Sequence, residues 1–149
     1  MTNDDRVAAV LAQKGGKLHS VPLGATVFEA LQLMADRDIG AVTVMSAGKL
    51  CGVFSERDYA RKVILAGKAS KGTRVEEIMN SAPIVVEPNV RISDCFQAMT
   101  KYRVRHLPVV ENGRVVGIVS IGDLVNWMIE SQDTEIEHLN HYIAGAYPS

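Results

Sequence analysis

The sequence has little of what marks several large classes of protein. Its 149 residues include two cysteines, Cys51 and Cys95, without the CxxC spacing of redox or metal sites, so both are expected to be small, reduced core residues. Aromatic residues make up 5% of the chain, too few for the stacking platform of a single-strand-binding protein. No apolar run approaches the roughly 18 residues of a membrane span. These shortages favour a cytoplasmic globular protein.

Charge and catalytic motifs exclude further classes. The net charge is −1, which gives no field to attract nucleic acid or an acidic membrane, so neither is expected as a partner. The N-terminus lacks the basic and apolar regions of a secretory signal. No glycine-rich phosphate loop, serine elbow or HExxH pattern occurs. His138 and His141 have no third strong metal ligand nearby, so we expect neither a metal site nor an enzyme.

An internal repeat is the main feature that the chain does have. Displaced by 65 positions, residues 27–64 lie over residues 92–129 without a gap. The identical pairs include Met34 with Met99, Val44 with Val109, Gly52 with Gly117, Ser55 with Ser120, and Asp58 with Asp123. Each copy predicts the order β-α-β-β-α. Because one copy is too small to bury a core alone, we expect an α+β fold of two pseudo-symmetric modules packed through their sheets.

The elements of each copy follow from hydrophobic spacing and turn residues. Apolar residues at i, i+3, i+4 and i+7 predict amphipathic helices that start at Val27 and Ile92. The predicted capping boxes and hairpin turns are Thr26 with Glu29, Thr73 with Glu76, Ala47-Gly48, and Asn112-Gly113. The predicted strands are 18–21, 41–45, 50–55, 84–86, 106–110 and 115–120, and the predicted closing helices are 56–66 and 121–131.

Short segments separate and flank the two modules. The predicted divisions are an N-terminal helix in 1–16, a first module in 17–67, a linker with a short helix in 68–80, a second module in 81–131, and a C-terminal helix with a tail in 132–149. Each terminal helix, at 3–13 and 134–144, carries one apolar face, and neither has an evident partner inside the repeats. We therefore expect these helices to dock on each other or on a second subunit, as in a homodimer.

A G-x-x-S-x-x-D segment occurs at the same place in both copies, at 52–58 and 117–123. Its serine stands where a strand ends and a helix begins, where unpaired backbone N–H groups favour a phosphate. The aspartate can accept hydrogen bonds from both hydroxyls of a ribose. Together these groups indicate a nucleotide site. Ser-x-x-Asp is equally a capping box, however, and duplication would copy a cap as faithfully as a binding site.

Cations stand near both motifs but are divided unequally. Arg57 lies inside the first motif and could donate a forked pair of hydrogen bonds to a phosphate, whereas the second motif has Gly122 at that position. Arg105-His106 precedes the second hairpin, where the first copy has Gly40-Ala41. The alternative for each cation is an ordinary solvated side chain. If these residues do bind a phosphate, the two sites should differ in affinity.

These features together resemble a tandem pair of CBS (cystathionine β-synthase) domains, a Bateman module. The resemblance covers about residues 17–131. It rests on the strands before Pro22 and Pro88, the helices with Met34 and Met99, the RVRHLPVV segment at 103–110, and both G-x-x-S-x-x-D motifs. It implies a binding protein with two clefts between its modules.

The resemblance also implies a ligand and the residues that hold it. The ligand would be an adenine nucleotide: AMP first, with ADP, ATP and NAD(H) as alternatives, and S-adenosylmethionine as another ligand of such pairs. In one cleft the ribose and phosphate would contact Ser120, Asp123, Arg105 and His106, and the adenine would contact Lys14, His19, Ile39, Gly40 and Ala41. In the mirrored cleft the corresponding residues would be Ser55, Arg57 and Asp58, with Val85 and Val104 lining the base pocket.

The function expected is a stand-alone regulatory module in signal transduction. A bound nucleotide would change the angle between halves or subunits, and an unknown partner protein would respond to that change. Two other functions stay open. One is an adaptor whose motifs are only helix caps. The other is a catalyst with Asp58 or Asp123 as a base, which is disfavoured because no acid, nucleophile or metal cluster accompanies either aspartate.

Overall fold

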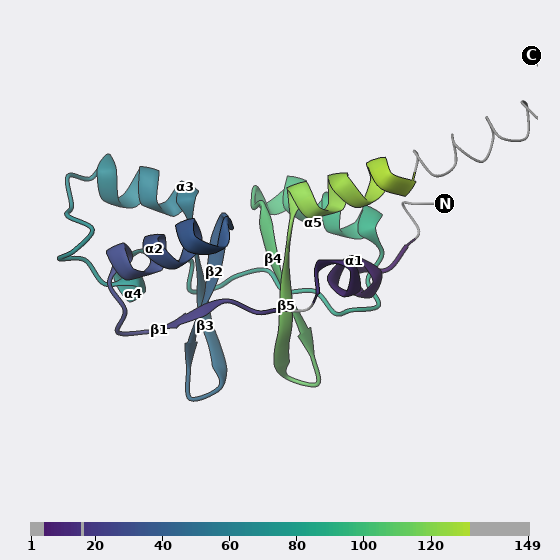
Figure 1. Cartoon of the computed structure of the whole chain (residues 1–149), viewed down its shortest axis with the longest axis horizontal. Helices are drawn as coiled ribbons and strands as arrows, with labels where there is room; N and C mark the ends of the chain where they lie inside the picture. The colour runs from purple at the N-terminus through teal and green to yellow at the C-terminus, as the bar shows by residue number, and fades with distance from the viewer. Residues whose placement is uncertain (1–4, 16, 132–149) are drawn as a thin grey trace, which may run out of the picture.

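Two halves of similar build lie side by side in a computed structural model, which describes residues 5–15 and 17–131 (Figure 1). The first half contains β1 (Ser20–Pro22), α2 (Val27–Arg37), β2 (Ala41–Ser46) and β3 (Lys49–Ser55). β1 runs parallel to β2, and β2 pairs antiparallel with β3. After β3 the chain forms one α-helical turn, α3 (Glu56–Asp58), and continues as a π-helix, η2 (Tyr59–Ile64).

The second half repeats this order with one loss. It contains α5 (Ile92–Tyr102), an antiparallel hairpin of β4 (His106–Glu111) and β5 (Arg114–Ser120), and a helix over 121–131. The strand predicted at 84–86 is reduced to a single parallel bridge between Val86 and Val109. In the first half the N–H of Thr43 donates to the carbonyl of His19. The equivalent residue here is Pro108, which has no N–H to extend the ladder.

Both hairpins turn as the sequence predicts. Ala47 and Gly48 have φ of 52° and 78°, and Asn112 and Gly113 have the same two values. Two successive residues with positive φ form the type I′ turn, whose twist matches that of the flanking strands. In Figure 1 the two hairpins extend to the same side of the molecule, away from α2, α3 and α5.

Each half has its own hydrophobic core. Val27 of α2 and Phe54 of β3 are fully buried in the first core, and Ile92 of α5 and Leu107 of β4 in the second. Burying each such side chain contributes about 1.5–3 kcal/mol to folding. The sheets meet where β3 contacts β5. The predicted α+β fold of two pseudo-symmetric modules packed through their sheets is therefore confirmed.

Two short helices, each leading into one half of the chain, pack on the other half. α4 (Val75–Ile78) leads into the second half, yet Val75 and Ile78 lie in the first core. α1 (Val7–Lys14) leads into the first half, yet Val7 and Val10 lie in the second core, and Figure 1 shows α1 beside β5. The expectation that the N-terminal helix has no partner inside the repeats is wrong. Its apolar face is covered by the more distant module.

The cap predicted before α4 is displaced by one residue. The hydroxyl of Thr73 donates to the carbonyl of Ala69 at 2.8 Å, and the N-cap position of α4 is taken by Arg74. The carboxylate of Glu77 instead accepts from the N–H of Arg74 at 2.7 Å. At α2 the prediction holds for the threonine, because Thr26 Oγ1 accepts from the N–H of Glu29 at 3.1 Å.

The two cysteines are unpaired, as predicted. Cys95 is buried in the second core and Cys51 is half-buried against the first. Burial, with a smaller contribution from the charge of Asp94, raises the pKa of the Cys95 thiol to about 11. The predicted C-terminal helix at 134–144, with both of its histidines, lies outside the described residues. Within the described part of the chain, no helix is long and apolar enough to cross a membrane.

Candidate functional site

Both G-x-x-S-x-x-D motifs form complete capping boxes. Ser55 Oγ accepts from the N–H of Asp58 at 3.2 Å, and Asp58 Oδ2 accepts from the N–H of Ser55 at 3.0 Å. The second motif repeats these bonds between Ser120 and Asp123, at 3.0 and 2.8 Å. The capping alternative is therefore correct as far as it goes. The capping bonds fix each aspartate carboxylate at the start of the helix that follows the hairpin, whether or not a ligand is also bound.

The glycine of each motif serves packing between distant segments. A methyl group on Gly52 would lie 2.7 Å from the carbonyl oxygen of Asn80, and one on Gly117 would lie 2.8 Å from Cδ2 of Leu11. Gly52 thus admits the segment that follows α4, and Gly117 admits α1. Neither glycine has positive φ, so the requirement comes from close approach rather than from backbone conformation.

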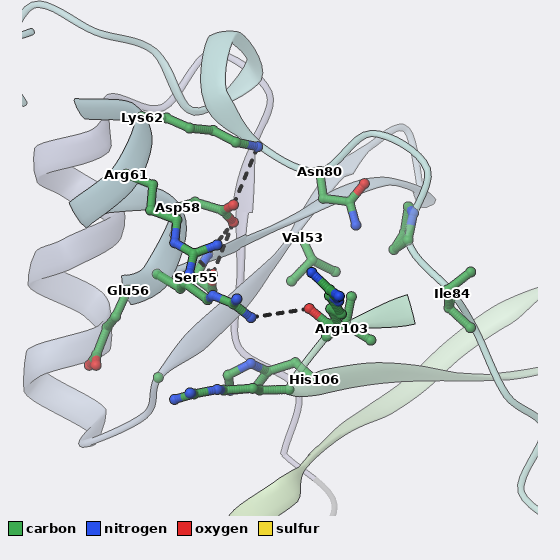
Figure 2. Close-up of a pocket in the computed structure, with 15 residues that line it drawn as sticks. Val53, Ser55, Glu56, Asp58, Arg61, Lys62, Asn80, Ile84, Arg103 and His106 are labelled. Atoms are coloured by element: carbon green, nitrogen blue, oxygen red, sulfur yellow. Dashed lines mark hydrogen bonds and ion pairs between the residues drawn. The ribbon is translucent and has the colours of Figure 1, made fainter. Parts of the chain in front are cut away.

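A cleft of about 430 Å³ lies beside Asp58 (Figure 2). We call it the Asp58 cleft. One wall comes from β3, α3 and η2, and the other from the segment after α4 and the loop between α5 and β4. Its lining residues are Gly40, Val53, Ser55, Glu56, Arg57, Asp58, Arg61, Lys62, Asn80, Pro83, Ile84, Arg103, Val104, Arg105 and His106. Both halves of the molecule therefore contribute to one site.

A hydrogen bond joins the two walls. Arg57 Nη1 donates to the carbonyl oxygen of Arg103 at 3.1 Å, which is drawn in Figure 2. This bond uses one of the N–H donors of Arg57, and the guanidinium, predicted to contact a phosphate, lies across the cleft. On the first wall, Lys62 Nζ lies 3.4 Å from Asp58 Oδ1. The Asp58 side chain is 18% exposed, so its carboxylate remains within reach of a ligand.

The Asp58 cleft is strongly basic. Five of its lining residues are lysine or arginine and two are carboxylates, an excess of three positive charges in a chain whose net charge is −1. A basic cleft attracts anions and raises their local concentration. Ile84, Val53 and Val104 add an apolar side to the cleft, against which a flat ring could lie.

His106 lies at the contact between the halves. Its ring is close to the backbone of Gly40, since a methyl group there would be 3.4 Å from Nε2. Burial holds the pKa of His106 below its usual value, and this effect outweighs the opposing charge of Asp123. The imidazole is therefore neutral near pH 7. It can donate or accept one hydrogen bond in the cleft without adding charge.

The second motif has a different neighbour. Lys14, the last residue of α1, places Nζ 2.7 Å from Asp123 Oδ2 and 2.8 Å from the carbonyl oxygen of Ile118. The carboxylate that was predicted to hold a ribose is thus paired with an ammonium group from the N-terminal helix. Lys14 was predicted near an adenine, and the structure places it on the carboxylate.

Seven of the predicted site residues line the Asp58 cleft, and three others, Lys14, Ser120 and Asp123, lie together at the second motif. Those that line the Asp58 cleft are Gly40, Ser55, Arg57, Asp58, Val104, Arg105 and His106. Arg105 and His106, expected with Asp123, lie between the two motifs. Arg57 ties their loop to α3, while the carbonyl of Arg105 accepts from the N–H of Ile121 at 2.9 Å and His106 pairs with Ser120 across the β4–β5 ladder. Val85 is 46% exposed, and Ile84 lines the cleft in its place.

Three further predicted residues, Ile39, Ala41 and His19, make contacts within the first half. Ala41 is buried and Ile39 packs against the first core. The carbonyl of His19 accepts from Thr43, which joins β1 to β2. Arg61, Asn80 and Arg103 were not predicted as site residues although they line the cleft. Arg61 follows Asp58 by one helical turn, and Arg103 stands inside the RVRHLPVV segment, so both could have been found from spacing.

Comparison with known proteins gives the same fold and the same repeat. The family model described as CBS domain matches the chain twice, at residues 13–64 and 75–130. The chain belongs to the CBS domain family. A CBS-domain protein from Burkholderia ambifaria superimposes on this CBS pair with a TM-score of 0.82 and 42% identity, covering 86% of this chain and 96% of that one.

Two other relatives extend the comparison. The mitochondrial CBS domain-containing protein CBSX3 of Arabidopsis thaliana is 39% identical over 127 residues, which are 82% of this CBS pair and 62% of the relative. The pair thus spans less than two thirds of that protein's length. A CBS domain protein of Pyrobaculum aerophilum complexed with AMP has a TM-score of 0.70 and 27% identity, covering 80% of this chain and 89% of that one.

Proposed function

We propose that this CBS pair is a regulatory module that binds an adenine nucleotide in the Asp58 cleft. The observation that carries the proposal is the joining of a fixed carboxylate, an apolar side and an excess of positive charge in one cleft. A carboxylate suits ribose hydroxyls, and cations suit phosphates. The Pyrobaculum relative complexed with AMP supports this ligand class. AMP, ADP, ATP and NAD(H) are all candidates, and S-adenosylmethionine is an alternative.

The proposed mechanism is a shift between two arrangements of the halves. The cleft has one wall from each half, and Arg57 already bonds across it to the backbone of Arg103. A nucleotide that contacts both walls would stabilise one relative position of the halves over others. It can shift the equilibrium only by its difference in affinity for the two arrangements. A partner protein would bind one arrangement. No catalytic step is part of the proposal.

Self-association belongs to the same proposal. Ile121, Val125 and Ile129 are spaced four residues apart on the helix over 121–131 and are 42%, 41% and 49% exposed. Residues at this spacing form one stripe. We propose a homodimer in the cytoplasm, with this stripe in the interface. Light scattering should give twice the 16.2 kDa chain mass, and the mass should fall toward one chain in Val125→Glu.

Thermal unfolding with each candidate ligand tests nucleotide binding. A ligand at 100 times its dissociation constant adds about 2.7 kcal/mol, which for a chain of this size raises Tm by roughly 5–10 °C. We expect that rise with at least one adenine nucleotide, and its loss in Asp58→Asn. Asn retains the size and part of the capping capacity of Asp. Absence of any shift with AMP, ADP, ATP, NADH and S-adenosylmethionine would contradict nucleotide binding.

One observation favours the adaptor function instead. Each Ser/Asp pair is already satisfied within the chain as a helix cap, so neither motif needs a ligand. In an adaptor, Asp58→Asn and Asp123→Asn would both lower the stability of the ligand-free protein by similar amounts. Because neither motif would bind a nucleotide, neither substitution would change the effect of an added nucleotide on Tm. Loss of the shift in Asp58→Asn alone separates the two functions.

A further inference from the structure

The cations of the Asp58 cleft form two groups on different walls. Arg57, Arg61 and Lys62 belong to the α3 and η2 segment, and Arg103 and Arg105 belong to the loop before β4. Figure 2 shows Arg61 with the first wall and Arg103 with the second. The polar groups Ser55 and Asp58, which suit a ribose, lie on the first wall.

Internal bonds already occupy two of these five cations. Arg57 donates to the carbonyl of Arg103, and Lys62 pairs with Asp58. The side chains of Arg61, Arg103 and Arg105 make no hydrogen bond or ion pair with other described residues. Arginine presents a planar fork that matches phosphate oxygens, and it keeps its charge at all relevant pH values. The cleft therefore offers forked donors from both walls.

The number and placement of these donors exceed what one phosphate needs. A single phosphate monoester carries between one and a half and two negative charges near neutral pH, roughly, and one arginine fork can bind two of its oxygens. Two linked phosphates carry more charge and extend further, so they can contact one wall with each phosphate. An excess of three positive charges suits such a group.

We propose that the Asp58 cleft selects ligands with a pyrophosphate unit over nucleoside monophosphates. Arg61 and Arg103 are the residues that determine this selectivity. The inference rests on the proposed function for the adenine and ribose, but it concerns only the phosphate end of the ligand. ADP, ATP and NADH all contain the required unit, whereas AMP does not.

Calorimetric titration of the full chain with AMP and ADP, without divalent cations, tests the selectivity. ADP should bind about tenfold more tightly than AMP, since one additional charged hydrogen bond at an exposed site has about that effect. Arg61→Gln and Arg103→Gln should each remove most of this preference and change AMP binding little. Arg103→Gln keeps the carbonyl that Arg57 contacts. Arg114→Gln, an exposed arginine of β5 outside the cleft, is the matched control and should leave the preference intact.

A second arm uses inorganic anions so that the ligand's adenine has no part in the result. Pyrophosphate should raise Tm of the wild-type chain more than phosphate at equal concentration, and Arg103→Gln should abolish the difference. If AMP binds as tightly as ADP, or if the preference survives both substitutions, the selectivity is wrong while the proposed function stands. If no nucleotide binds but pyrophosphate still acts through Arg103, the selectivity holds and the adenine site is wrong. If ADP is preferred as expected, titration with ATP and NADH distinguishes a triphosphate from a dinucleotide.

Discussion

At Gly52 the carbonyl of Asn80 comes so close to β3 that no side chain fits between them. A methyl group would lie 2.7 Å from that oxygen, and backbone atoms cannot rotate away. At Gly117 the nearest group is the end of the Leu11 side chain, at 2.8 Å, which can change rotamer. The two glycines occupy the same place in the repeat but differ in how much their neighbours can yield.

Substitution of the two glycines should therefore have unequal effects. We expect Gly52→Ala to lower the free energy of unfolding by about 1–3 kcal/mol, the range for overpacking a well-filled interior. Gly117→Ala should cost clearly less, because Leu11 can adjust. Urea denaturation of both variants measures the difference. Equal losses, or a larger loss at Gly117, would show that the close approach of the segment after α4 is not rigid.

The charge state of His106 gives the stability a pH dependence. Burial holds its pKa in the folded state below the usual value near 6.5, so the unfolded chain takes up the proton first as the pH falls. The stabilisation from the neutral imidazole is present above about pH 6.5 and is lost as the pH falls below it. The charged groups that act on His106 are Asp123, Lys14, Asp58 and Arg105.

Urea denaturation at a series of pH values from 8 down to 5 tests this assignment. The free energy of unfolding of the wild type should decrease more steeply below about pH 6.5 than that of His106→Gln, which lacks the titrating group. The difference between the two curves isolates His106 from the other histidines and the carboxylates. Parallel curves would mean that His106 has the same pKa in the folded and unfolded chains.

At the scale of elements, the exchange of α1 and α4 links the two halves. Each short helix leads into one half and packs on the other, α4 through Val75 and Ile78 and α1 through Val7 and Val10. Asp5, just before α1, is fixed as well, because its carboxylate accepts from Trp127 Nε1 at 2.7 Å. The N-terminal helix is thus a structural part of the second half.

Shortening Val10 measures that packing. Val10 is 1% exposed, and Val10→Ala removes two methyl groups from the second core, so it should lower the free energy of unfolding by about 1.5–3 kcal/mol. Val116→Ala is the matched control, since Val116 lies on β5 and is 37% exposed. Its effect should be much smaller. If both variants lost the same small amount, α1 would not be packed on the second half in solution.

Elements with a strong local pattern could be predicted from the sequence, and those that depend on distant partners could not. α2, α5 and both hairpins follow from apolar periodicity and from Asn-Gly or Ala-Gly turns. The π-helical path of η2, with its bond from the N–H of Leu65 to the carbonyl of Ala60, could not be foreseen, because six residues do not separate two helical periods. The packing of α1 was missed because that helix precedes the gapless repeat.

The sequence predicted the type of site, a nucleotide cleft at the repeated motif, but not the full set of residues that line it. Asp58, Ser55 and Arg105 were identified because their motifs recur or resemble the family pattern. Arg61 and Arg103 lie beside those residues in the sequence, so spacing could have indicated them although neither belongs to a repeated motif. Arg105 and His106 line the Asp58 cleft as well as adjoining the second motif, because of where the loop before β4 passes, and only tertiary packing determines that path.

At the scale of the whole molecule, duplication has produced two motifs with unequal surroundings. Asp58 opens onto a basic cleft with walls from both halves, whereas Asp123 is held by the ammonium group of Lys14. A ligand at Oδ2 of Asp123 would compete with that ion pair, which contributes about 0–1 kcal/mol when partly exposed, as a ligand at Oδ1 of Asp58 would compete with Lys62. The cations of the two copies, which the sequence spreads over both, converge on one cleft.

The central claim is that the Asp58 cleft binds a nucleotide between the two halves. A crystal structure of the chain with ADP tests it most directly, because it shows where each group of the ligand lies. The account predicts ribose hydroxyls at Asp58, the base against the apolar side formed by Ile84 and Val104, and the two phosphates between Arg61 and Arg103. ADP bound elsewhere, or bound in this cleft without contact to Asp58, would contradict it.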